Sequence, residues 1–206
     1  MAPKGDSLLI LLMAAGSAQR FGANKLMAPF RGQTIIRRSV DIAVATGFRV
    51  AVVIGAYEAE LRGAVDGADV IVDFNSSWYR GLGCSIAHGV RTVTSNANPP
   101  AAVIVAMADQ VALQSTSYIG LATRYVESGR EDIIVSRSKG SDCPPCLFPA
   151  FAFPALMALD GDRGARRVLE QWSSHVVRHS LPEAAYDVDT VDDLAVLTRS
   201  ATGGRI

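Results

Sequence analysis

The sequence has few of the features that mark secreted, membrane-spanning or nucleic-acid-binding proteins. Its 206 residues include only three cysteines, which form no dense or even-numbered disulfide framework and suit a reducing compartment. The 20 basic and 20 acidic side chains cancel, so no net field favours nucleic acid or an anionic membrane. No run approaches the roughly 20 apolar residues that span a bilayer. We therefore expect a cytoplasmic protein without a membrane or nucleic-acid partner.

The N-terminal stretch partly matches a secretion signal. Lys4 precedes an apolar run over residues 8–15, and the small residues Gly16-Ser17-Ala18 follow it. However, Asp6 interrupts the basic region, and the apolar run is at the short limit for such signals. Cleavage would also destroy the ordered motif that overlaps this run. We therefore interpret the run as part of the folded domain.

Short apolar runs alternate with longer helix-like segments. Unbroken apolar strands indicate burial on both faces, and their alternation with helices indicates a parallel sheet covered by helices. The expected strands are 8–13, 50–54, 70–72, 102–107 and 133–135, and the expected helices are 34–46, 57–65, 81–93 and 115–127. The predicted fold class is α/β, a Rossmann-like and mostly parallel three-layer sandwich. Because no repeat or linker is visible, we expect residues 1–206 to form a single domain.

The pattern changes in the last third of the chain. Residues 137–154, RSKGSDCPPCLFPAFAFP, combine turn residues with prolines, which favours an edge strand or a small excursion from the sheet. Helical character returns at residues 165–172, and a short strand is expected at 176–178. Thr190 is expected to cap a last helix that runs through Arg199.

The stretch LMAAGSAQRFGANK, residues 12–25, follows the first expected strand. Ligands of open parallel sheets bind beyond the carboxyl ends of the strands, and small residues there let backbone N–H groups approach a phosphate. Arg20 and Lys25 add positive charge. Because the only glycines are Gly16 and Gly22, neither the dinucleotide fingerprint nor the P-loop pattern fits. The alternative is an ordinary strand-to-helix turn with two solvated cations.

Two carboxylates qualify as metal ligands. Asp109 follows a buried strand in VIVAMADQV, where a charge is costly unless a cation pairs with it, and Mg²⁺ is the natural partner. Asp189, in YDVDTVDDL, is the best second ligand and Asp187 a weaker one. Taken alone, Asp109 could be a helix cap and the second motif an ordinary helix start. Taken together, they predict a two-carboxylate Mg²⁺ site.

The segment DFNSSWYRGLGCSIAHGV, residues 73–90, predicts a helix start with free backbone N–H groups at Gly81 and Gly83. Ser85 is placed to hydrogen-bond a ligand, and base discrimination by such a bond is expected; otherwise Ser85 is a simple helix-start residue. We interpret His88 as structural or solvent-facing, because it has no carboxylate or cysteine companions that would suggest a ligand.

These motifs together resemble the nucleotidyltransferases with a glycosyltransferase-A-like Rossmann fold, whose signature is L-A-A/G-G-x-S/G-x-R-M/F-G-x-x-K. Within the MobA/MocA-like group the likeness is closest to the molybdenum-cofactor cytidylyltransferases, which carry A-A-G where the guanylyltransferases carry A-G-G. The resemblance implies catalytic roles for Lys25, Arg20 and Asp109, and Mg²⁺ held by Asp109 and Asp189. It implies that the nucleotide is bound by Met13, Ala14, Ala15, Gly16, Ser17, Lys25, Gly55, Asn75, Gly81 and Ser85. Gly55 is otherwise a plain strand-ending glycine.

The acceptor side departs from the family. LDGDRGAR, residues 159–166, is similar to the family's L-x-G-D-x-G-A-R, which implies that Arg166 meets an anionic group of a pterin; a solvated cation is the alternative. Cys143 stands where the family has an acceptor-site histidine, and Val111 replaces a proline after Asp109. Cys143 and Cys146 lack the partners of a zinc site, and the following prolines disfavour a redox helix, so we expect two reduced cysteines.

The resemblance implies transfer of CMP from CTP to a phosphorylated, pterin-type acceptor such as molybdopterin or molybdenum cofactor, with release of pyrophosphate. A molybdoenzyme client is a further implied partner. Two alternatives stay open. One keeps the fold but uses GTP, or a sugar or polyol phosphate as acceptor. The other is a non-catalytic protein that binds molybdenum cofactor and delivers it to an apo-enzyme.

Overall fold

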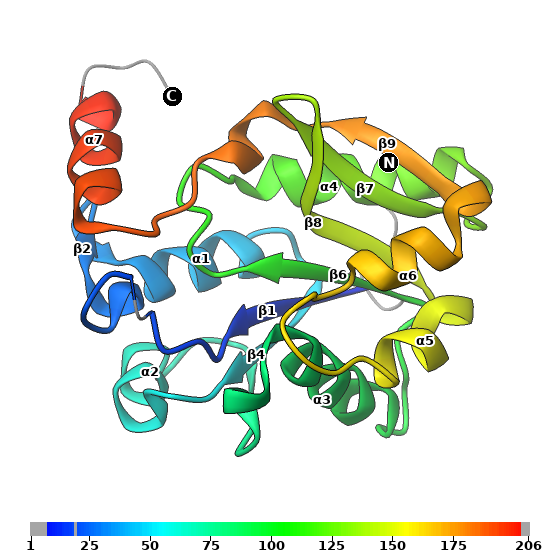
Figure 1. Cartoon of the computed structure of the whole chain (residues 1–206), viewed down its shortest axis with the longest axis horizontal. Helices are drawn as coiled ribbons and strands as arrows, with labels where there is room; N and C mark the ends of the chain where they lie inside the picture. Colours follow the sequence, from blue (N-terminus) through cyan, green and yellow to red (C-terminus); the bar gives the residue numbers. More distant parts are fainter. Residues whose placement is uncertain (1–7, 19, 203–206) are drawn as a thin grey trace.

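The computed structural model describes residues 8–18 and 20–202, and a seven-stranded sheet runs through it (Figure 1). The order is β5 (Ile71–Phe74), β4 (Arg49–Ile54), β1 (Leu8–Ala14), β6 (Ala102–Met107), β8 (Ser141–Pro149), β7 (Ile133–Ser138) and β9 (Val176–Ser180). β8 is antiparallel to both its neighbours, whereas all other pairs are parallel. A small antiparallel hairpin joins β2 (Pro29–Phe30) to β3 (Gln33–Thr34). The predicted mostly parallel α/β fold is confirmed.

Helices cover both faces of the sheet. One face carries α1 (Ile35–Val44), α2 (Glu58–Ala64), α4 (Ser115–Glu127) and α7 (Val191–Thr202); the other carries α3 (Leu82–Thr94), α5 (Phe153–Met157) and α6 (Arg166–Gln171). Short 3₁₀ helices are η2 (Lys25–Met27), η3 (Trp78–Arg80), η4 (Ala150–Ala152), η5 (Ser173–His175) and η6 (Pro182–Ala185). Among the described residues, no helix is long and apolar enough to cross a membrane.

Strand β1 divides the core into its two layers. All seven of its residues are buried. Leu8, Ile10 and Leu12 pack into the cluster under α1, α2 and α4, whereas the alternate residues Leu9 and Leu11 pack into the cluster under α3 and α5. Since successive side chains of a strand point to opposite faces, an unbroken apolar run is what a doubly covered strand requires. The three-layer arrangement follows directly from this pattern.

The prediction of an edge strand or excursion at residues 137–154 is wrong. Half of this segment forms β8, which lies inside the sheet between β6 and β7. Only Cys146–Pro149 pair with β6, and a bulge in the pairing with β7 passes over Pro144 and Pro145. These two prolines therefore stand where neither neighbour needs an N–H donor. Their carbonyls accept instead from Gln110 Nε2 at 2.8 Å and Ser136 Oγ at 2.6 Å.

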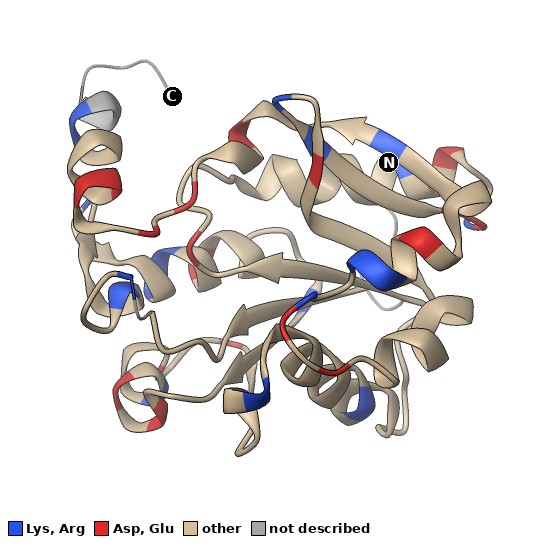
Figure 2. Cartoon of the chain, viewed as in Figure 1, with Lys and Arg blue, Asp and Glu red and all other residues tan. Residues whose placement is uncertain are grey.

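The carboxyl ends of β1, β4 and β6 meet at one edge of the sheet. Their register pairs Ala14 with Ile54, and Met13 with both Val53 and Met107. Figure 2 shows that β1 and β6 carry no charged residue, so the charges near this edge come from the segments that follow the strands. This is the edge at which ligands of parallel sheets bind.

One helix packs too closely for a side chain. A Cβ on Gly89 of α3 would lie 2.6 Å from Val53 Cγ2 and 2.8 Å from Leu11 Cδ1. We expect Gly89→Ala to lower the free energy of unfolding by about 1–3 kcal/mol, because the core would have to shift. Gly63→Ala is the control, since its Cβ meets nothing within 4 Å; it should raise stability by about 0.4–1 kcal/mol. Urea denaturation measures both, and equal responses would contradict the close packing.

Candidate active site

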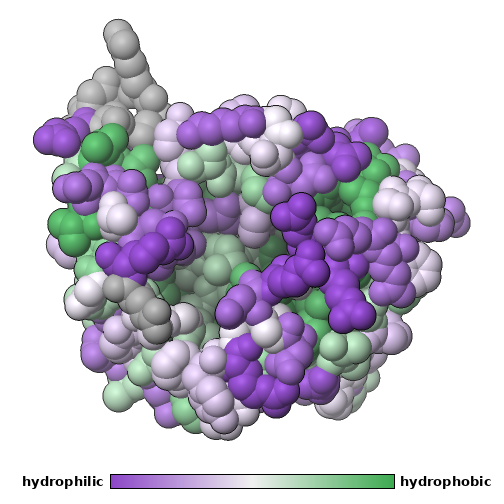
Figure 3. All heavy atoms as spheres, viewed as in Figure 1, coloured by the Kyte–Doolittle hydropathy of each residue, from purple (hydrophilic) through white to green (hydrophobic). Residues whose placement is uncertain are grey.

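A cleft of about 580 Å³ opens at the carboxyl edge of the sheet. Figure 3 shows it as a hollow near the centre of this face, with apolar atoms deep inside and hydrophilic atoms at the rim. Its walls come from the loop after β1, the end of β6, the start of α3, and two later segments of the chain. The lining residues are Met13–Ala18, Arg20, Lys25, Leu26, Trp78, Tyr79, Gly81, Leu82, Ser85, Met107, Asp109, Asp162 and Asp189.

The end of β4 holds the loop after β1 from behind. Ala56 N–H donates to the carbonyl of Ala15 at 3.1 Å, and Tyr57 Oη donates to the carbonyl of Ser17 at 3.0 Å. A Cβ on Gly55 would lie 2.6 Å from Ala15 O, so only glycine allows this approach. These two hydrogen bonds hold the loop against the segment that follows β4. Gly55 thus lies behind the loop rather than in the cleft lining, and Tyr57 is a contact that sequence reasoning missed.

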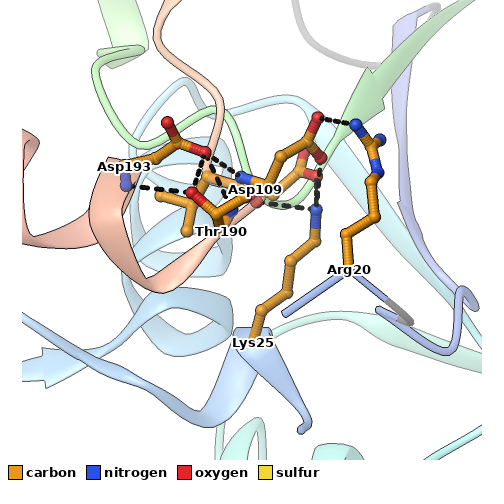
Figure 4. Close-up of polar contacts among 7 residues, drawn as sticks. Arg20, Lys25, Asp109, Thr190 and Asp193 are labelled. Carbon is orange, nitrogen blue, oxygen red and sulfur yellow. Dashed lines mark hydrogen bonds and ion pairs between the residues drawn. The ribbon is translucent and has the colours of Figure 1, made fainter. Parts of the chain in front are cut away.

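The ammonium of Lys25 lies at the centre of the polar end of the cleft (Figure 4). Lys25 begins η2 and donates to Asp109 Oδ2 at 2.5 Å, to the carbonyl of Val188 at 2.7 Å, and to Asp189 Oδ1 at 3.2 Å. The side chains of Lys25 and Asp109 are only 15% and 13% exposed. Asp109, for which we expected Mg²⁺ as the partner cation, is paired with the ammonium of Lys25 in this structure.

Burial and charge act in opposite directions on this pair. Burial raises the pKa of Asp109 by more than the neighbouring Lys25 lowers it. Burial alone would lower the pKa of Lys25, but the attraction and hydrogen bonds of Asp109 and Asp189 outweigh it and raise that pKa. Lys25 therefore stays protonated at neutral pH, as a phosphate-binding cation must.

Asp189 is positioned by the start of α7. The backbone N–H groups of Asp189 and Thr190 donate to Asp193 Oδ2, at 3.2 and 2.8 Å, and Asp193 N–H donates back to Thr190 Oγ1 at 3.2 Å. This reciprocal pair is a capping box, which confirms the predicted cap. Val188 N–H donates to the carbonyl of Asp109 at 3.1 Å and brings the two segments together. Arg20 forms an ion pair with Asp189 at 2.9 Å.

The donor set fits a hard divalent cation. Both carboxylates contact the single ammonium of Lys25, which shows that they converge on a point where a cation is stabilised. Mg²⁺ is held by one or two carboxylates together with substrate phosphates and water. No cluster of three or more His, Cys, Asp or Glu is found in the described part of the chain, so phosphate oxygens and water would complete the coordination. Asp187 forms a backbone bridge with Gln110 and is not among the lining residues.

The other wall of the cleft is the start of α3. Gly81 precedes the helix with a φ of 107°, a backbone conformation that favours glycine. Ser85 is 2% exposed, and its hydroxyl accepts from Asn75 Nδ2 at 3.0 Å. Asn75 is itself buried and accepts from Ser77 N–H, so it orients Ser85 without lining the cleft. His88 Nε2 lies 3.1 Å from Asp73 Oδ1, so it has a carboxylate companion that the sequence did not suggest, but it is not among the residues that line the cleft.

The two predicted acceptor residues lie outside the cleft lining. Arg166 is exposed on α6 and pairs with Glu170. Cys143, in β8, donates to the carbonyl of Ser136, and burial raises its pKa. Burial raises the pKa of Cys146 to about 12, and all three cysteines are free thiols, as expected. The loop before Arg166 instead contributes Asp162 to the cleft.

A family comparison agrees with this geometry. Residues 10–177 match the model of the MobA-like NTP transferase domain, which includes the loop after β1, Lys25 and Asp109. The chain belongs to this family. As a MobA-like NTP transferase it is a nucleotidyltransferase by family, and its sheet and covering helices form the Rossmann-like fold of that group. Asp189 lies beyond the matched residues.

Two curated relatives are similar along almost the whole chain. Purine catabolism protein PucB of Bacillus subtilis (strain 168) is 26% identical over 204 residues, covering 94% of this chain and 97% of PucB. Nicotine blue oxidoreductase of Paenarthrobacter nicotinovorans is 28% identical over 197 residues, covering 89% of this chain and 93% of the relative. The different names of these relatives show that the family model alone does not fix the substrates of this MobA-like NTP transferase.

A solved structure has the same fold. The crystal structure of Rv0371C from Mycobacterium tuberculosis H37Rv, in complex with manganese, superposes with a TM-score of 0.72 at 23% identity. The match covers 94% of this chain and 99% of the mycobacterial chain. The similarity of fold therefore extends over almost the whole chain.

The buried pair of Lys25 and Asp109 predicts a pH-dependent loss of stability. We expect Lys25→Met to lower the free energy of unfolding by about 3 kcal/mol at neutral pH, since it leaves the Asp109 carboxylate buried without its cation. Because burial raises the pKa of Asp109 in the folded protein, the loss should be full above that pKa and should shrink as the pH falls through it and the carboxylate is protonated.

The double variant Lys25→Met/Asp109→Asn is the control, because no unpaired charge is left between these positions. It should recover much of the lost stability in urea denaturation. Purely additive losses would show that the two side chains do not depend on each other.

The tyrosine behind the loop predicts a separate kinetic effect. We expect Tyr57→Phe to raise the KM for the nucleoside triphosphate by about three- to tenfold, the range of one neutral hydrogen bond, with a smaller change in kcat. The loss of Tyr57 Oη would loosen the carbonyl of Ser17 without removing any group that contacts the reacting atoms. Tyr186→Phe, far along the chain and partly exposed, is the matched control. Identical KM values in both variants would exclude the positioning role.

Proposed function

We propose that this MobA-like NTP transferase transfers CMP from CTP to the phosphate of a molybdopterin-type acceptor and releases pyrophosphate. The observation that carries the proposal is the position of Lys25, in contact with both Asp109 and Asp189 beside an amide-rich loop. This combination gives the cleft cations, N–H donors and metal-binding carboxylates at one end. A triphosphate needs all three.

In the proposed reaction an acceptor phosphate oxygen attacks the α-phosphorus in line. The new P–O bond forms as the bond to the β-phosphate oxygen breaks, and pyrophosphate leaves with that electron pair. A phosphate nucleophile needs little general-base help, so catalysis consists mainly of positioning and charge neutralisation. The amides of residues 15–17 would bind the phosphates, and Arg20 and Lys25 would neutralise charge that develops at the α-phosphate and leaving group.

Asp109 and Asp189 would hold a divalent cation, which would supply positive charge to neutralise part of the charge of the phosphates. The manganese complex of the mycobacterial relative supports a divalent metal in this fold. On binding the metal, the two carboxylates would release Lys25 and Arg20 from their present ion pairs. Both cations line the cleft and would then be available to the phosphates.

Two features support CTP as the donor. The sequence Ala14-Ala15-Gly16 matches the cytidylyl rather than the guanylyl pattern. In addition, the hydroxyl of Ser85 accepts from Asn75, which leaves its own hydrogen to donate to a ligand. Cytosine offers an acceptor at its unprotonated ring nitrogen, whereas uracil and guanine carry a hydrogen at the corresponding position. An oriented donor therefore favours cytosine.

The pterin-type acceptor rests on the sequence resemblance, since Arg166 and Cys143 lie away from the cleft lining. The cleft is large enough for a nucleotide and part of a second ligand, because small-molecule sites have volumes of roughly 300–1,000 Å³. A molybdoenzyme is the client that this acceptor implies. The rival assignments are a transferase that uses GTP or a sugar or polyol phosphate, and a non-catalytic protein that delivers molybdenum cofactor.

Pyrophosphate release is the direct test. The protein is incubated with a molybdopterin-type acceptor, Mg²⁺ and CTP, GTP, ATP or UTP in parallel. We expect release with CTP, and none after chelation of the metal, because the carboxylates would then bind Lys25 again. Release only with GTP would overturn the choice of base. If CTP binds in an Mg²⁺-dependent manner and no pyrophosphate appears, the transferase assignment with this acceptor fails.

A further inference from the structure

The loop between α5 and α6 is fastened to the start of α3. Gly83 N–H donates to the carbonyl of Gly161 at 2.7 Å, and Arg80 forms an ion pair with Asp160 at 2.6 Å. A Cβ on Gly83 would lie 2.9 Å from two carbonyl oxygens of this loop, and one on Gly81 would clash with the Asp162 carboxylate. The loop and the helix start therefore form one continuous wall of the cleft.

Among the residues that the structure describes, no cation forms an ion pair with Asp162, which also belongs to this wall. It lines the cleft beside Gly81, on the same wall as Ser85. Asp109 and Asp189 are held by Lys25, and Asp160 is held by Arg80. Within residues 8–18 and 20–202, the Asp162 side chain makes neither a hydrogen bond nor an ion pair. An ionised carboxylate in this position can only accept hydrogen bonds, and it repels phosphate.

The ligand group that suits Asp162 is therefore an N–H donor on a flat ring. Both reactants of the proposed transfer carry one, since cytosine has an exocyclic amino group and a pterin has an amino group beside a ring N–H. We propose that Asp162 is a specificity residue that accepts a hydrogen bond from the amino group of an aminopyrimidine ring in the cleft. This inference rests on the proposed function. Because both reactants carry such an amino group, the group that Asp162 binds belongs either to the cytosine of the donor or to the pterin of the acceptor.

A carboxylate at position 162 would make the cleft selective for a ring that carries an amino group. A hydrogen bond to a charged group contributes more than one between neutral groups, and an analogue that lacks the amino group leaves the carboxylate facing an oxygen. The preference for an amino over an oxo substituent at that ring position should be about tenfold or more. Removing the carboxylate should remove this contribution to the preference while leaving the phosphate-binding end of the cleft unchanged.

Equilibrium binding with matched ligand pairs tests the proposal. Kd values are measured for CTP and UTP with Mg²⁺, and for pterin and lumazine, which differ in one amino group. The wild-type protein should prefer the amino-bearing member of at least one pair, and Asp162→Ala should lower that ratio about tenfold, while any preference that Ser85 contributes through the ring nitrogen should remain. Asp162→Asn keeps one acceptor oxygen and should give an intermediate ratio. Arg163→Ala, in the same loop but outside the cleft lining, is the control that should leave both ratios unchanged.

The pair that responds identifies the source. A change in the CTP-to-UTP ratio assigns Asp162 to the donor base, and a change in the pterin-to-lumazine ratio assigns it to the acceptor. Unchanged ratios in a folded Asp162→Ala protein, checked by its thermal unfolding, overturn the inference. Because binding is measured without turnover, the two proposals fail separately. Asp162-dependent selectivity without pyrophosphate release contradicts only the transferase assignment, and release with unchanged ratios contradicts only the role of Asp162.

Discussion

The ammonium of Lys25 is the interaction on which the cleft depends. It joins three segments that are far apart in sequence: the loop after β1, the end of β6 at Asp109, and the strand-like segment before α7 at Val188 and Asp189. An isolated charge in this partly buried place would be unfavourable, but together the cation and carboxylates satisfy one another. The same groups are those that a metal–triphosphate complex requires. If the proposed function holds, the charges that stabilise the unliganded cleft are the same charges that bind the substrate.

Close backbone approach is the second constraint. Gly55 lets β4 reach the loop after β1 from behind, and Gly81 lets the loop before α6 reach the start of α3. A side chain at either place would push a wall of the cleft away from its support. The two walls differ in chemistry: one presents amides, Arg20 and Lys25, and the other presents Ser85 and Asp162. Phosphate groups suit the first wall and amino-bearing rings suit the second.

Membership of the MobA-like NTP transferase family accounts for the first wall more fully than for the second. The loop after β1 carries the signature, and the buried Lys25–Asp109 pair gives it a structural reason. The acceptor side departs from the pattern at Cys143, which here belongs to an interior strand and faces the carbonyl of Ser136. The names of the two relatives, one from purine catabolism and one an oxidoreductase, match this division between a shared fold and varied substrates.

Local patterns in the sequence determined the strands, the helices and the charge requirements of single residues. The apolar runs predicted the doubly covered strands, the Thr190–Asp193 spacing predicted the cap of α7, and burial after a strand predicted that Asp109 needs a cation. These features depend on residues that are close together in the chain, so periodicity and spacing are sufficient to predict them. Only the tertiary structure decided the place of β8 and the contacts of Tyr57 and Asp162. Each of these depends on which distant segments meet. A bulge in the pairing of β7 with β8 means that no N–H donor is needed at Pro144 and Pro145. Gly81, far from Asp162 in sequence, allows the loop that carries Asp162 to approach the start of α3 closely.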